Sequence, residues 1–158
     1  MIHARIETQE ERALRRLRLF DLMAPDDPDF VLAFRLLTQR AQEVAQAYTK
    51  RYLEIVPLGL DDKKQAKFVE RVTVGFKARY DVPVGVDWVL KGEELAQDIH
   101  RRGADPADHL SALSFAQTKE IIVVFEGIED PAVGIRIAAK MSRLQALDAE
   151  ILLTTVKQ

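Results

Sequence analysis

The chain has 158 residues, of which 47% are hydrophobic and 30% charged, with a formal net charge of −2 and no cysteine. This composition is typical of one soluble domain over residues 1–158, and it excludes disulfides, thiolate metal sites and cysteine nucleophiles. The small net charge gives no reason to expect nucleic acid or an anionic membrane as a partner. Because the sequence has neither a run long enough to cross a bilayer nor a signal peptide, we expect a cytoplasmic protein without membrane insertion.

Four helix starts can be predicted from local sequence. Three prolines follow aspartate, at Asp27-Pro28, Asp105-Pro106 and Asp130-Pro131. An aspartate at the N-cap accepts free backbone N–H groups, and a proline in the first turn has no N–H to leave unpaired. Thr8 and Glu11 match the spacing of a capping box, which predicts a fourth start.

Apolar residues recur at helical spacing between these starts and the scarce glycines and prolines, which predicts an all-α fold. The run Ile121–Phe125 could be taken for a strand, but it continues a helical pattern and is predicted as helix. Residues 74–88 contain Gly75, Pro83 and Gly85, and an irregular connection is expected there. The expected helices cover about 8–22, 28–56 (long enough to be two, joined near Gln39), 62–80, 87–102, 106–126 and 131–157.

No pattern in the chain indicates catalysis, so we predict that this domain is not an enzyme. It has no serine–histidine–acid set, no glycine-rich phosphate loop and no His-x-x-x-His pair. His100 and His109 are nine residues apart across a predicted helix break, which is not a two-ligand spacing. The acidic pairs Asp61-Asp62 and Glu93-Glu94 are interpreted as solvated surface charge.

Binding of a cofactor or partner remains, and His100 is the residue to consider. It lies near the end of a predicted helix whose apolar face includes Trp88, Leu95 and Ile99. A neutral imidazole presented from a helix into an apolar slot is a good axial ligand for haem iron. The alternative is an ordinary surface or C-cap histidine beside Arg101-Arg102.

The order of these features over residues 12–156 resembles the sensor globin domain of bacterial globin-coupled sensors, which is related to protoglobins. The resemblance implies a globin-like fold with an extra N-terminal helix and two long final helices. It rests on four stretches, namely ERALRRLRLFDLMAPDDPDFVLAFRLL, AQAYTKRYLEIVP, YDVPVGVDWVLKGEELAQDIHRRGADPADHLSALSFA and AAKMSRLQALDAEILLTTV.

The resemblance implies that the domain binds haem b and that His100 is the proximal iron ligand. Tyr48 would donate a hydrogen bond to bound oxygen, with Tyr52 as the neighbouring candidate, and Phe68 would line the distal side. Simple core packing is the alternative interpretation of Tyr48 and Phe68. On the helix of His100, Ile99 and Trp88 are further candidates to line the haem.

The sequence also departs from the family pattern. His100 and Gly103 enclose two residues where the family usually has three, so an ungapped alignment places Ile99 at the ligand position. Asp108-His109 stands where the family often has an aromatic pair, and the connection at residues 82–85 is unusual. The short spacing favours a different class, a haem-free globin-like signalling or dimerisation module. A bilin-carrying relative is disfavoured because no cysteine could attach the chromophore.

By this resemblance the domain senses oxygen, another diatomic gas or redox state. It would regulate an output region after Gln158, such as a diguanylate cyclase, a histidine kinase or a chemotaxis transducer.

The family pairs its last two helices across a two-fold axis, so a homodimer is expected. A stripe of apolar residues on the last helix could form that interface, together with a set of apolar residues on the preceding helix that could face it. Alternatively, the stripe packs only into the hydrophobic core of its own domain. The stripe is Ile137, Met141, Leu144, Leu147 and Ile151, and the facing set is Leu110, Leu113, Ala116 and Ile121.

Overall fold

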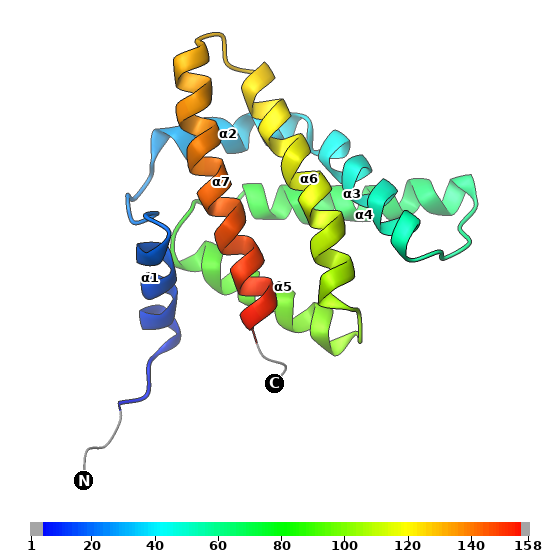
Figure 1. The fold of residues 1–158 in the computed structure, drawn as a ribbon, viewed down its shortest axis with the longest axis horizontal. Helices are drawn as coiled ribbons and strands as arrows, with labels where there is room; N and C mark the ends of the chain where they lie inside the picture. Colours follow the sequence, from blue (N-terminus) through cyan, green and yellow to red (C-terminus); the bar gives the residue numbers. More distant parts are fainter. Residues whose placement is uncertain (1–4, 156–158) are drawn as a thin grey trace.

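A computed structural model describes residues 5–155, and within this range every regular element is an α-helix (Figure 1). The predicted all-α fold is therefore confirmed. The helices are α1 (Gln9–Leu19), α2 (Pro28–Gln39), α3 (Ala41–Ile55), α4 (Asp62–Tyr80), α5 (Val86–Arg101), α6 (Pro106–Glu126) and α7 (Pro131–Thr154).

The helix starts follow the predicted caps. Asp27, Asp105 and Asp130 each accept a hydrogen bond from the backbone N–H two residues later, at 2.9–3.0 Å. Thr8 accepts one from the N–H of Glu11 at 3.1 Å. Local cap chemistry therefore determines where α1, α2, α6 and α7 begin.

Two expectations about helix continuity are resolved by the structure. The predicted segment 28–56 is two helices, and the break lies at Arg40. The expectation of an irregular connection over residues 74–88 is largely wrong, because α4 runs through Gly75 to Tyr80 and only residues 81–85 connect it to α5. Gly75 lies on the exposed side of α4, where a glycine lowers helix propensity without leaving a gap in the core. The last helix was expected to continue to residue 157, but α7 ends at Thr154 and Thr155 is extended. Residues 156 and 157 lie outside the described residues.

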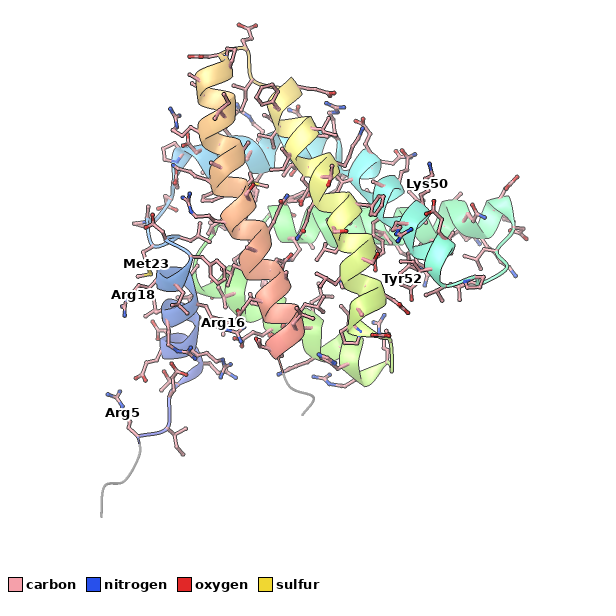
Figure 2. All side chains as sticks on the ribbon, viewed as in Figure 1. Arg5, Arg16, Arg18, Met23, Lys50 and Tyr52 are labelled. Atoms are coloured by element: carbon pink, nitrogen blue, oxygen red, sulfur yellow. The ribbon has the colours of Figure 1, made fainter. Side chains whose placement is uncertain are left out.

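The two longest helices, α6 and α7, run antiparallel and side by side at the front of the molecule as drawn in Figure 1. Helix α3 packs on α6 and on α4, which extends to the right in that view. On the opposite side, α1 packs on α5, and α5 packs on α7. Figure 2 shows Arg16 between α1 and α7, where its guanidinium donates to the Thr154 hydroxyl at 3.1 Å.

The apolar stripe that was considered for a dimer interface is buried within the protomer. All five of its residues are at most 4% exposed, and Leu113 and Ala116 of α6 are buried with them, whereas Leu110 and Ile121 are half-buried. The interpretation of this stripe as core is confirmed, so its residues are not available to a second copy. A different set of large apolar residues on α6 and α7 is exposed, and we call it the outer face: Phe115, Ile122, Phe125, Ile135 and Leu153.

None of the helices in residues 5–155 combines the length and the apolar character that crossing a bilayer requires.

Candidate functional site

His100 lies in the last turn of α5, and the chain leaves the helix just after it. Gly103 adopts a positive φ of 72°, which glycine accommodates without strain, and its N–H donates to the His100 carbonyl at 3.1 Å. The His100 side chain is half-buried. Its Nε2 atom is buried and makes no hydrogen bond to any residue of the described part of the chain. A buried ring nitrogen without a partner is uncommon, because desolvation of a polar atom is costly.

Three of the predicted site residues come together in one row of aromatic rings on α3 and α4. Tyr48 and Tyr52 stack with ring centroids 5.8 Å apart, and Tyr52 stacks in turn on Phe68 at 5.8 Å. Phe76 meets Tyr48 edge-on at 6.1 Å. Figure 2 labels Tyr52 near the end of α3. Tyr48 is buried while Tyr52 and Phe68 are half-buried, so the row leads from the core toward the surface.

The nearest polar partner of Tyr48 is His109, at the start of α6. The Tyr48 hydroxyl lies 2.6 Å from His109 Nδ1. Desolvation lowers the pKa of His109 to about 4 and raises the pKa of Tyr48 well above its usual value. Both side chains are therefore neutral at pH 7. The sequence drew attention to His109 for its spacing to His100 and as part of Asp108-His109, and it gave no reason to pair His109 with Tyr48.

The two other predicted site residues lie on α5 at different depths. Ile99 is half-buried and packs against the core. Trp88 is 3% exposed, and its ring stacks under the guanidinium of Arg79, whose carbon lies 3.9 Å from the ring centroid. Arg79 also donates to the Trp88 carbonyl at 2.7 Å. Trp88 thus contacts α4 through Arg79, away from the stacked rings of Tyr48, Tyr52 and Phe68.

A second polar cluster, which sequence reasoning missed, lies where α4, α6 and α7 meet. Tyr80 donates to the Glu120 carboxylate at 2.6 Å, and the amide of Gln145 donates to its other oxygen at 3.3 Å. Arg79 pairs with Asp148 at 3.2 Å. These five residues line an internal cavity of about 40 Å³. Desolvation raises the pKa of Glu120 to about 7. The sequence signal that could have revealed this cluster is the position of Glu120 just before the apolar run Ile121–Phe125, at helical spacing from Ala116 and Val124.

The interpretation of the acidic pair Glu93-Glu94 as surface charge is correct for only one of the two residues. Glu94 is exposed, but Glu93 is 6% exposed and binds two arginines of α1. Arg12 holds its carboxylate with two hydrogen bonds, at 2.6 and 3.0 Å, and Arg16 lies 3.4 Å away. Glu93 therefore fixes α1 against α5 and contributes to the fold rather than to a solvated face.

Two larger cavities open elsewhere on the surface. One of about 330 Å³ lies between α3 and α4 and includes Thr49, Lys50 and Gln65 in its lining. The other, of about 280 Å³, lies beside the start of α2 and includes Phe30 and Asp81. Neither these two nor the 40 Å³ cavity has His100 in its lining.

Comparison with known proteins adds no family to this description. No protein-family model matches the chain, and no curated protein matches its sequence significantly.

Proposed function

We propose that this domain is a cytoplasmic haem-based sensor of oxygen, another diatomic gas or redox state, with His100 as the haem ligand. The supporting observation is the buried Nε2 of His100, which lacks a hydrogen-bond partner among the described residues. In the tautomer with the ring proton on Nδ1, this Nε2 has a free lone pair that can bind iron, and it is held in the last turn of α5. When bound, haem would supply an iron that binds gas or changes redox state.

The residues of α3 and α4 would form the wall opposite His100. Tyr52 and Phe68 offer half-buried aromatic faces, which suit the apolar body of a porphyrin. Within this row, the Tyr48 hydroxyl is the one that forms a hydrogen bond to another side chain, that of His109. A neutral phenol such as Tyr48 can also donate a hydrogen bond to a gas ligand. Ile99 is half-buried on α5, next to His100 in the chain, and would help to exclude water from the iron-binding side chain of His100.

The domain itself would transmit a signal and would not catalyse a reaction. Any enzymatic activity would belong to an output region joined to it. Helix α5, which carries His100 in its last turn, is separated from α6 by only four residues, 102–105. A shift of the end of α5 therefore reaches the start of α6 directly. We propose that α6 and α7 pair with a second copy through the outer face, so that such a shift changes the arrangement of a dimer.

The haem proposal is tested by the absorption spectrum of the full chain after reconstitution with haem. We expect a Soret band in the native protein that is lost or shifted in His100→Ala. Arg101→Ala is the matched control, because Arg101 is the exposed neighbour of His100 and its removal leaves the imidazole in place. Native protein that remains helical by circular dichroism but shows no Soret band would overturn the proposal.

One observation favours the second candidate, a haem-free signalling or dimerisation module of the same fold. The rings of Tyr48, Tyr52, Phe68 and Phe76 contact one another, and His100 does not line any of the three cavities described above. Ligand pockets usually enclose about 300–1,000 Å³, so haem would have to separate side chains that now touch. Absence of a Soret band together with an intact dimer would favour this candidate.

A further inference from the structure

The environment of Tyr48 indicates a role for His109 that the sequence did not suggest. Three aromatic rings surround the Tyr48 ring, those of Tyr52, Phe76 and His109, at centroid distances of 5.8, 6.1 and 5.4 Å. This packing leaves the phenol little freedom to rotate, and its hydroxyl lies 2.6 Å from His109 Nδ1. His109 is itself fixed in the first turn of α6, four residues after the capping aspartate Asp105.

The direction of this hydrogen bond follows from the chemistry of the two groups. Both are neutral at pH 7, because burial lowers the pKa of His109 to about 4 and raises the pKa of Tyr48 well above its usual value. A phenol O–H is a stronger acid than an imidazole N–H, and an imidazole nitrogen is a stronger base than a phenol oxygen. The Tyr48 hydroxyl therefore donates, and Nδ1 of His109 accepts, with the ring proton on Nε2.

A tyrosine hydroxyl has a single proton to donate. While that proton is shared with His109, it is not available to a gas ligand. We propose that His109 is a positioning residue that holds the Tyr48 hydroxyl and competes with the gas ligand for its hydrogen bond. This inference rests on the proposed function, since it concerns the gas site of the same domain.

The proposal predicts selective effects on different gases. Oxygen accepts a hydrogen bond when it binds iron, whereas carbon monoxide gains much less from one. Removing the acceptor in His109→Leu should free Tyr48 and raise oxygen affinity by about three- to ten-fold, which corresponds to one neutral hydrogen bond. Carbon monoxide affinity should change by less than about two-fold. In His109→Asn the amide oxygen can take the place of Nδ1, so oxygen affinity should return toward the native value.

The experiment compares oxygen and carbon monoxide affinities of the reconstituted full chain in a double-mutant cycle. His109→Leu is made in the native background and in Tyr48→Phe, where it should no longer affect oxygen affinity. An effect of equal size in both backgrounds, or an equal change for both gases, would mean that His109 acts through general packing, and this would overturn the proposal.

A second readout needs no haem. Proton NMR of the haem-free protein should show a slowly exchanging tyrosine hydroxyl resonance that disappears in Tyr48→Phe and in His109→Leu. Failure of the chain to take up haem would overturn the proposed function and, with it, the role of His109 in gas binding. A missing hydroxyl resonance in a chain that does take up haem would overturn the role of His109 alone.

Discussion

Glu120 is a carboxylic acid on the inward side of α6, between Val123 and Ala116 of the buried core. Its carboxylate accepts hydrogen bonds from Tyr80 and Gln145, which compensate only part of the lost hydration. Desolvation is the largest influence and raises its pKa from 4.5 to about 7. In the folded protein Glu120 is therefore near the midpoint of its titration at physiological pH.

This raised pKa makes the effect of Glu120→Gln on stability depend on pH. The folded state keeps a proton that the unfolded state releases between pH 4.5 and 7, so ionisation of Glu120 lowers native stability as pH rises through that window. Glutamine removes this cost. The free energy of unfolding of Glu120→Gln, minus that of the native protein, should be about 2–3 kcal/mol larger at pH 8 than at pH 4.5, so the variant gains relative stability as pH rises. Urea unfolding at several pH values measures it.

Glu129→Gln is the matched control, because Glu129 is exposed at the turn before α7. Its stability difference from the native protein should be nearly constant over the same pH range. Parallel stability curves for Glu120→Gln and the native protein would contradict a raised pKa at Glu120.

At the scale of elements, α1 is attached to the rest of the molecule through the buried side chains of Ala13 and Leu17 and through a cluster of charged residues. Arg12 and Arg16 bind Glu93 of α5, and Arg16 also lies 3.6 Å from Glu150 and bonds to Thr154 on α7. Arg16 is 7% exposed, so these partners compensate for the water that its guanidinium loses on burial. Removal of one partner from a buried ion pair leaves the other charge uncompensated. The resulting loss of stability is larger than the stability that the intact pair contributes.

Glu93→Gln should therefore destabilise the protein by roughly 2–4 kcal/mol and loosen α1 first. Hydrogen exchange should show faster exchange of the α1 amides, with smaller changes in α6. Glu94→Gln is the control, because Glu94 is the exposed neighbour of Glu93, and its effect should stay within about 0.5 kcal/mol. Equal effects of the two substitutions would mean that the contacts of Glu93 do not hold α1.

The starts of α1, α2, α6 and α7 were predictable because a helix cap depends on neighbouring residues. An aspartate before a proline caps a helix whatever packs against it, and α2, α6 and α7 start where this pattern predicts. The environments of Glu93, His109 and Glu120 were not predictable in the same way. Each depends on side chains at least 25 residues away in the chain, and no local rule specifies those neighbours. The grouping of Tyr48, Tyr52 and Phe68 was expected from the family resemblance, whereas the bond to His109 was not.

At the scale of the whole molecule, the surface of α6 and α7 differs from the rest of the protein. On the outer face, Ile122 and Ile135 are 42% and 63% exposed. Along α7, the positions between Ile135 and Leu153 on the same side are Ala139, Ser142 and Ala146. This strip carries no charge in a chain in which 30% of residues are charged. Exposed apolar residues on one uncharged side of a helix are typical of protein–protein interfaces.

If the outer face pairs two copies across a two-fold axis, Ile122→Lys and Ile135→Lys should each convert the protein from dimer to monomer. In a two-fold interface every substitution occurs twice, so each variant buries two charges in an apolar contact. Light scattering during size exclusion should give twice the chain mass for the native protein and a single chain mass for both variants. Val74→Lys is the control, because Val74 is 64% exposed but lies on α4, so this variant should remain dimeric. A native monomer, or dimers in all three variants, would contradict pairing through this face.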